Sequence, residues 1–137
     1  MEPGTYTLLL ELERQTTVTF GAAGSRVLEA GFYAYTGSAF GPGGLSRVDR
    51  HERVLQGEND ARHWHVDYLL GTPTVSWIGA WVSPDRQAEC EIAGSLPGRS
   101  VAGIGATDCD CNSHLTFQST KGELRDEIET VHEERYS

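Results

Sequence analysis

A group of cationic side chains follows a glycine-rich loop in the first half of the chain. Arg47, Arg50 and His51 fall within about one helical turn. They come directly after the Gly-Pro-Gly-Gly segment at residues 41–44. Before this loop, residues 32–37 are rich in aromatic side chains that favour a β-strand. A strand, a glycine loop and a basic helix start present N–H groups and cations to an anion, so the pattern indicates a phosphodiester site.

Two histidines and an aspartate form a second group of residues that can bind metal. His63, His65 and Asp67 are close in sequence, and His63 and Asp67 are four residues apart, which a helix would place on one face. A metal cluster is one interpretation of this pattern. The other is that Trp64 and Tyr68 fill the core while the histidines make hydrogen bonds.

A cysteine-rich loop is the third candidate. Cys109, Cys111 and His114 lie within six residues, and Cys90 is on a predicted helix further upstream. Four nitrogen and sulfur ligands are the usual set for structural Zn²⁺, although the single residue between Cys109 and Cys111 is tighter than the usual spacing. Zinc is therefore one interpretation, and buried thiols that pack as small apolar groups are the other.

The formal charge is −9, which opposes long-range attraction to nucleic acid. Lys121 is the single lysine beside ten arginines, and an arginine-rich, acidic composition resembles adaptation to high salt, as in haloarchaea. At molar salt the Debye length falls to about 3 Å, which screens this repulsion. Residues 122–137 hold six acidic and two basic residues, and we interpret this tail as a solvated face with a weak helix.

The length of 137 residues predicts a single domain over residues 1–137. No apolar run approaches the roughly 20 residues of a membrane span, so no membrane partner is expected. Three cysteines and no export pattern at the N-terminus favour a cytoplasmic protein without a disulfide framework.

Turn residues and hydrophobic periodicity divide the chain into short elements. Residues 15–20 are predicted to pair with a first strand at 4–12, and residues 26–28 to extend the sheet. Ser83 and Pro84 are expected to cap a helix. Further strands are expected at 32–37, 75–82, 101–104 and 115–118, and helices at 45–56, 63–70, 85–96 and 124–131.

Two tripeptides in these strands carry a family resemblance. Gly4-Thr5-Tyr6 opens the first strand, Tyr35-Thr36-Gly37 ends a later one, and the helix with Arg47 and His51 follows. This ordered set resembles the GIY-YIG nuclease superfamily, and more closely its Uri-type branch from archaea and bacteria. The resemblance covers roughly residues 4–118, including the segments at residues 37–44, 50–51, 63–69, 89–90 and 108–115.

The resemblance implies a fold, a reaction and a set of site residues. The fold would be α+β, a small mainly antiparallel sheet with flanking helices. The reaction would be metal-dependent hydrolysis of a DNA phosphodiester. Tyr6 would help to activate water, Tyr35 would be the second tyrosine of the catalytic site, and His51 would be the polar ring that supports it. Arg47 would stabilise the phosphate charge, and Glu89 would hold one Mg²⁺ or Mn²⁺ ion. Glu91 competes with Glu89 for that role, and Ser38, Arg50 and Arg53 would contact DNA.

The two tripeptides lie further apart than in many members, so an extra hairpin is expected over roughly residues 13–30. Each site residue also has an ordinary structural interpretation. Tyr6 and Tyr35 can be sheet residues, Arg47 and Arg50 surface charges, and Glu89 a solvated carboxylate.

Three functions remain open from the sequence. The first is a metal-dependent endonuclease in DNA repair or processing, with DNA and a repair protein as its partners. The second is a non-catalytic nucleic-acid-binding accessory domain that keeps the nuclease fold. The third is a zinc-stabilised interaction module.

Overall fold

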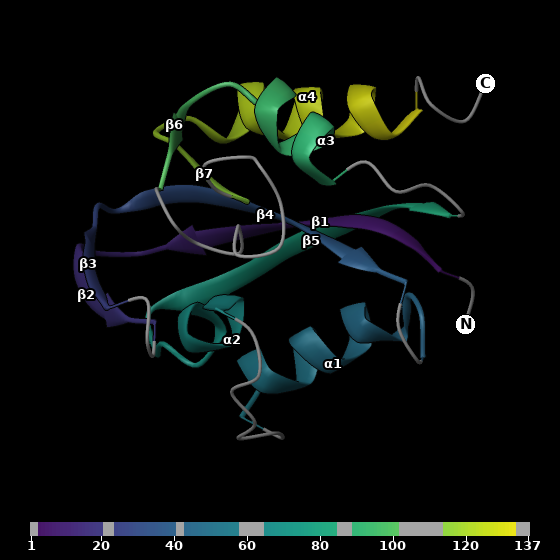
Figure 1. Ribbon diagram of the computed structural model, residues 1–137. Coiled ribbons are helices and arrows are strands. Elements are labelled where there is room, and N and C mark those ends of the chain that lie inside the picture. Colours follow the sequence, from purple (N-terminus) through teal and green to yellow (C-terminus); the bar gives the residue numbers. More distant parts are fainter. Residues whose placement is uncertain are drawn as a thin grey trace.

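The structure is a computed structural model, and it describes residues 3–20, 24–40, 43–57, 65–84, 89–101 and 114–133. A five-stranded antiparallel sheet lies between two helical layers, with α1 and α2 on one face and α3 and α4 on the other (Figure 1). The predicted α+β fold, a mainly antiparallel sheet with flanking helices, is therefore confirmed. None of the described helices is both long and apolar enough to cross a membrane.

The described elements follow the predicted order. The strand expected at 101–104 differs, because a short strand covers Arg99–Ser100, residue 101 is not in a strand, and residues 102–104 lie outside the described residues. The strands are β1 (Gly4–Leu12), β2 (Thr16–Thr19), β3 (Ser25–Leu28), β4 (Gly31–Ala39), β5 (Val75–Pro84), β6 (Arg99–Ser100) and β7 (Leu115–Gln118). The helices are α1 (Ser46–Leu55), α2 (His65–Leu70), α3 (Glu89–Ser95) and α4 (Lys121–Glu133).

The first strand, β1, is the centre of the molecule. It pairs with β4 on one side and with β5 on the other, in the sheet order β5-β1-β4-β7-β6. Because helices cover both faces, nearly every residue of β1 is buried, which explains the apolar run Leu8-Leu9-Leu10 where a half-exposed strand would alternate.

Alternation along the strands divides the core into two parts. Tyr6, Leu8 and Leu10 face α1 and α2, whereas Leu9 faces α3 and α4. The first core includes residues from the sheet, the hairpin and two helices: Tyr33, Tyr35, Phe20, Leu45, Val54, Val66, Leu69 and Leu70. The second is smaller and comprises Leu9, Ala34, Ile92, Leu96, Leu124, Ile128 and Val131.

The expected extra hairpin is present, but its pairing differs from the prediction. Among the described residues, β2 and β3 pair with each other in a separate two-stranded sheet, and β1 takes β4 and β5 as partners instead. The buried residues Phe20, Val18 and Leu28 anchor the hairpin to the first core. Anchoring by side chains therefore replaces the predicted backbone pairing with residues 4–12.

The predicted helix cap at Ser83 and Pro84 is wrong, because both residues end β5. Pro84 is paired in register with Gly4, and Ser83 with Thr5. Proline is tolerated there because β5 is an edge strand of its sheet. A Cβ on Gly4 would lie 2.6 Å from the carbonyl oxygen of Ser83, so the first glycine of the Gly4-Thr5-Tyr6 tripeptide is needed for this close approach.

A buried polar network attaches α4 to the sheet. The Ser83 hydroxyl shares a 2.7 Å hydrogen bond with His132 Nδ1, and the Thr7 hydroxyl shares one of 2.8 Å with His132 Nε2. The Thr7 hydroxyl also lies 3.1 Å from that of Thr36. Burial lowers the pKa of His132 from 6.5 to about 4, so the imidazole is neutral in the folded protein near neutral pH.

The buried His132 predicts an acid-sensitive fold. Between pH 6.5 and about 4 the unfolded chain binds this proton more readily than the folded one. Stability should therefore fall through that window, by at most about 3 kcal/mol from this group, and stay level below it. Urea unfolding from pH 7 to pH 4 measures the slope, and His132→Gln, which cannot titrate, should show a shallower one. Equal slopes in the two proteins would contradict this assignment.

Candidate functional site

The two tyrosines of the tripeptides lie on neighbouring strands and face the same helical layer. In the antiparallel register of β1 and β4, Tyr6 is opposite Gly37 and Tyr35 is opposite Leu8. Residues paired in this way share a face of the sheet, and both tyrosines belong to the core beneath α1 and α2. Their ring centroids are 6.4 Å apart. The structure thus brings Tyr6 and Tyr35 together, as the resemblance implied.

Gly37, the last residue of the second tripeptide, makes room for the Tyr6 ring. A Cβ added at this position would lie 2.5 Å from the Tyr6 hydroxyl oxygen and 2.6 Å from the adjoining ring carbon. Both distances are shorter than real contacts. The requirement for glycine at this position is therefore steric. It arises because the glycine of the second tripeptide packs against the tyrosine of the first.

Replacing Gly37 with alanine should displace Tyr6 and destabilise the fold by about 1–3 kcal/mol, the usual cost of overpacking. The matched control is Gly94→Ala, at an exposed position of α3 where an added Cβ meets nothing within 4 Å. Alanine there should be neutral or stabilising by up to about 1 kcal/mol. Urea unfolding compares the two variants, and equal stability would show that the Tyr6 ring does not depend on Gly37.

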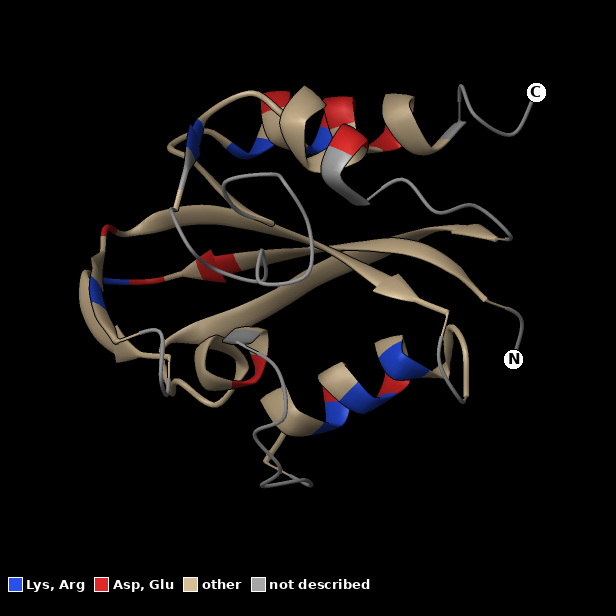
Figure 2. Ribbon diagram, viewed as in Figure 1, with Lys and Arg blue, Asp and Glu red and all other residues tan. Residues whose placement is uncertain are grey.

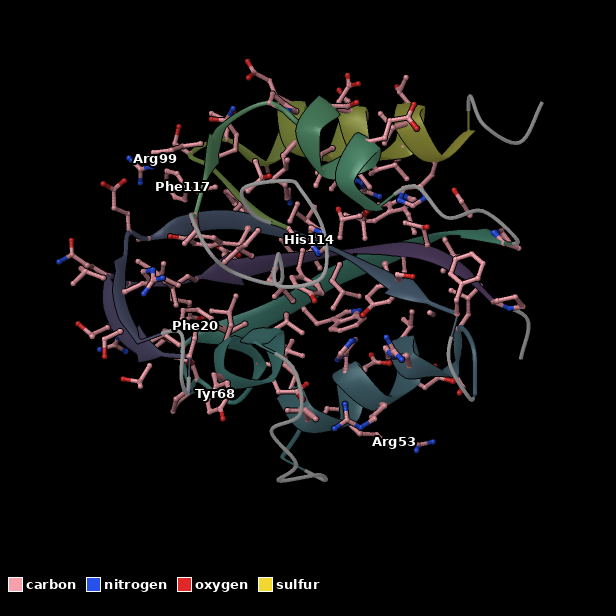
Figure 3. All side chains as sticks on the ribbon, viewed as in Figure 1. Phe20, Arg53, Tyr68, Arg99, His114 and Phe117 are labelled. Atoms are coloured by element: carbon pink, nitrogen blue, oxygen red, sulfur yellow. The ribbon has the colours of Figure 1, made fainter. Side chains whose placement is uncertain are left out.

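His51 reaches the two tyrosines from α1. Its Nε2 shares a 2.8 Å hydrogen bond with the Tyr6 hydroxyl, and neither residue is more than 2% exposed. The His51 ring lies 5.4 Å from the Tyr6 ring and 6.4 Å from the Tyr35 ring, measured between centroids. His114, the residue just before β7, lies 6.4 Å from Tyr35 on the same measure (Figure 3). Tyr6, Tyr35, His51 and His114 thus form a connected aromatic cluster.

Arg47 joins the cluster from the first turn of α1. One of its guanidinium nitrogens donates a 2.5 Å hydrogen bond to the backbone carbonyl of Ser38, which ties the helix start to the end of β4. A hydrogen bond and the charge of Arg47 also act on the Tyr6 hydroxyl. Arg47 and Ser38 were both predicted site residues, and the structure places them together beside Tyr6.

The surroundings oppose ionisation of Tyr6 and of His51. Burial, followed by the neighbouring Tyr35, raises the pKa of Tyr6 well above 10, and Arg47 acts in the opposite direction. Burial is also the largest influence on His51 and lowers its pKa below 6.5, while the Asp67 carboxylate acts to raise it. The pair is therefore a neutral phenol and a neutral imidazole near pH 7.

The remaining α1 arginines have different surroundings. Arg50 lies with one guanidinium nitrogen 3.5 Å from a carboxylate oxygen of Asp67 on α2. Arg53 is exposed and extends from the side of α1 that faces away from the sheet (Figure 3). Of the three residues predicted to contact DNA, Arg53 is exposed, whereas Arg50 and Ser38 are half-buried.

Asp67 belongs to the tyrosine–histidine cluster. The carboxylate is fully buried and lies 3.4 Å from His51 Nδ1. The sequence singled out Asp67 through its spacing from His63, but His63 and the side chain of His65 lie outside the described residues. The contact with His51 was missed because the two residues come from different helices, and no local spacing signals such a pair.

Two of the predicted metal and zinc ligands, Asp67 and His114, lie at this cluster, and the others lie outside the described residues or have side chains that are not described. Glu89 opens α3, whose described apolar residues pack on the opposite face of the sheet from Arg47; the side chains of Glu89 and Cys90 are not described. Cys109 and Cys111 also lie outside the described residues. Within the part of the chain that is described, no three His, Cys, Asp or Glu residues form a metal-capable group.

Comparison with protein families places the chain in a family. A family described as a domain of unknown function, DUF123, matches residues 5–137. The chain belongs to this family. No curated protein and no solved structure matched in the corresponding comparisons. The DUF123 match includes β1 with Tyr6, α1 with Arg47 and His51, and α2 with Asp67, so the cluster lies wholly inside the family's domain.

Proposed function

We propose that this protein is an endonuclease that hydrolyses phosphodiester bonds in DNA. The observation that carries the proposal is the 2.8 Å hydrogen bond between the Tyr6 hydroxyl and His51 Nε2, beside Arg47. These are three of the residues that the resemblance to GIY-YIG nucleases assigns to catalysis. A phenol, an imidazole and a guanidinium in contact form a set suited to proton transfer and to stabilising phosphate charge.

The chemistry follows from the neutral state of Tyr6 and His51. A free phenolate is disfavoured by burial, so Tyr6 can take a proton from an attacking water only as its own proton leaves. His51 Nε2 is at hydrogen-bond distance from the Tyr6 oxygen and is the group placed to receive that proton. The guanidinium of Arg47 then stabilises the negative charge that builds up on the phosphate oxygens.

A divalent ion remains a prediction from the resemblance. When bound, Mg²⁺ or Mn²⁺ would add Lewis-acid stabilisation of the phosphate charge. The described residues do not fit such an ion at the cluster, because Asp67, the carboxylate beside His51, already faces His51 and Arg50 and α3 covers the other face of the sheet.

The charge distribution supports an approach of DNA from the α1 side. Arg47, Arg50 and Arg53 lie on α1 beside Asp49 and Glu52, whereas most of the charged residues on α4, across the sheet, are acidic (Figure 2). A net charge of −9 repels DNA overall, and the acidic helix concentrates part of that repulsion away from the site. High salt would weaken the long-range repulsion more than it weakens close contacts between arginines and phosphates, since screening acts mainly on charges that are far apart.

A non-catalytic nucleic-acid-binding domain is the second candidate. The burial of Tyr6 and His51 favours it, because a reacting phosphate has to reach the hydroxyl of a side chain that is 2% exposed. In that case the cluster would contribute only to the stability of the fold, and the arginines of α1 would bind DNA without cleaving it.

One assay separates the two candidates. The purified protein is incubated with plain, branched and damaged DNA, with Mg²⁺, Mn²⁺ or EDTA, at low and at molar salt. Cleavage that depends on Arg47 and His51 supports the nuclease. DNA binding without cleavage under all of these conditions supports the accessory domain, and neither binding nor cleavage would reject both.

Two further variants in the same assay test whether Glu89 is a ligand of the divalent ion. Cleavage abolished by EDTA and by Glu89→Gln would place the ion at the predicted ligand. Glu91→Gln is the matched control, because Glu91 is the competing carboxylate in the same helix. The zinc content of protein purified without added metal tests the third function, a zinc-stabilised interaction module. A zinc-free protein would reject that function.

A further inference from the structure

Asp67 is a buried carboxylate that the predicted catalytic set does not include. It is fully buried on α2, between two residues of α1. One carboxylate oxygen lies 3.4 Å from His51 Nδ1 and the other lies 3.5 Å from a guanidinium nitrogen of Arg50. Burying a carboxylate costs several kcal/mol of desolvation unless partners compensate. Its position between these two side chains therefore calls for a physical reason.

The reason lies in the two nitrogens of the His51 ring. A neutral imidazole carries one N–H, on either nitrogen, and the other nitrogen is an acceptor. An ionised carboxylate only accepts hydrogen bonds, so Asp67 favours the N–H at Nδ1. The remaining nitrogen, Nε2, then faces the Tyr6 hydroxyl as an acceptor at 2.8 Å. In this arrangement Tyr6 is the donor.

We propose that Asp67 is a positioning residue, which holds His51 in the Nδ1–H tautomer and thereby makes Tyr6 the hydrogen-bond donor in a Tyr6–His51–Asp67 relay. The 3.4 Å contact is long for a hydrogen bond, and Asp67 acts on His51 both as a hydrogen-bond acceptor and through its charge. Arg50 offsets that charge, and Arg47 acts on the Tyr6 oxygen from the other side. The charged groups acting on His51 are thus Asp67, Arg50 and Arg47.

The catalytic consequence rests on the proposed nuclease function. The oxygen of a water molecule forms a bond to phosphorus while the bond to the leaving oxygen breaks. The water proton passes to the Tyr6 oxygen as the Tyr6 proton passes to His51 Nε2, and solvent protonates the leaving oxygen. The imidazolium, stabilised by Asp67, then returns its proton to solvent. Water is added across one phosphorus–oxygen bond, with no change in oxidation state.

The tautomer can be measured without any activity. Long-range ¹H–¹⁵N correlation spectra of ¹⁵N-histidine protein distinguish a protonated from an unprotonated ring nitrogen, and a His51→Gln variant assigns the signals. We expect wild-type His51 to have a protonated Nδ1 and an unprotonated Nε2. The opposite tautomer in the wild-type protein would overturn the proposal, and this measurement needs no destabilising substitution.

The Asp67→Asn variant tests whether Asp67 is the cause of the His51 tautomer. An amide can donate as well as accept, so His51 should lose its single tautomer, and cleavage should fall on the order of 10²- to 10⁴-fold. Asp49→Asn, at an exposed position of α1, is the matched control and should change neither the His51 tautomer nor the rate of cleavage. The single variant removes the carboxylate that faces Arg50. A double variant, Asp67→Asn with Arg50→Gln, removes both charges and is compared with the single variant, and circular dichroism checks that both proteins are folded.

The outcomes separate the relay from the nuclease. An Nδ1–H tautomer that disappears in both Asp67 variants, in a protein that cleaves no DNA, supports the relay and rejects the nuclease. Cleavage by the wild-type protein with an unchanged tautomer in Asp67→Asn overturns the role of Asp67 and leaves the nuclease standing.

Discussion

Replacing Tyr6 with phenylalanine is expected to reduce DNA cleavage on the order of 10²- to 10⁴-fold, the range associated with a positioned acid–base group. The substitution removes the hydroxyl that shares the 2.8 Å hydrogen bond with His51 and keeps the ring that lies over Gly37. The fold should lose only about 1 kcal/mol, since one buried hydrogen bond is lost. Single-turnover cleavage and urea unfolding measure the two effects separately.

The matched control for Tyr6 is Tyr33→Phe. Tyr33 lies on β4, faces the same core and is also almost fully buried. Its hydroxyl donates a 2.7 Å hydrogen bond to the backbone carbonyl of Glu29, outside the Tyr6–His51 cluster. Loss of the Tyr33 hydroxyl should leave cleavage within about twofold while costing similar stability. Equal losses of cleavage in both variants would contradict a specific role for Tyr6.

The second large effect is expected for Arg47→Ala, on the order of 10²- to 10³-fold in cleavage, because a preorganised donor to the phosphate charge is removed. Arg47→Lys keeps the charge but loses the planar fork, so an intermediate loss is expected. Both substitutions also remove the guanidinium that bonds the Ser38 carbonyl, and about 2 kcal/mol of stability should be lost with it. Cleavage rates are therefore compared at a temperature where each variant is folded.

Arg125→Ala is the control for Arg47. Arg125 is exposed on α4, across the sheet from the cluster, and pairs with Glu129 one turn away. Its loss should leave both cleavage and stability nearly unchanged, since exposed ion pairs contribute little. If Arg47→Ala cleaves DNA as fast as Arg125→Ala, the assignment of Arg47 to the phosphate is wrong.

The structure gives a physical reason for both glycines of the two tripeptides. Gly4 allows the backbone of β5 to approach β1, and Gly37 allows the Tyr6 ring to lie against β4. Together they let two strands pack closely around one tyrosine, whose hydroxyl is directed at His51. The tripeptides are thus parts of one packing arrangement, although more than twenty residues separate them along the chain.

Local sequence signals were sufficient for most of the elements and for part of the cluster. The apolar run at residues 4–12 and the aromatic run at 32–37 predicted β1 and β4, and the spacing of Leu124, Ile128 and Val131 predicted α4. Arg47 and His51, four residues apart, were expected on one helix and occur on α1. These predictions succeed because they depend on neighbours within a turn or a strand.

The face that each element covers was decided by tertiary structure. Glu89 fits a local motif, yet Ile92 on α3 and Leu96 just after it pack on the side of the sheet away from His51. The pairing of β2 with β3 instead of β1 is a similar case, because β1 takes partners that are distant in sequence. Such choices depend on which arrangement buries the most apolar surface, which no short window contains.

The sequence by itself determined the α+β class, the two tyrosine strands and the basic helix that follows the glycine loop. Only the tertiary structure decided that the His51 ring lies between Tyr6 and Asp67. The physical reason is that the three residues come from β1, α1 and α2, and packing of these elements around one core fixes their distances. Residue type sets which chemistry is available, and the shared core sets which groups meet.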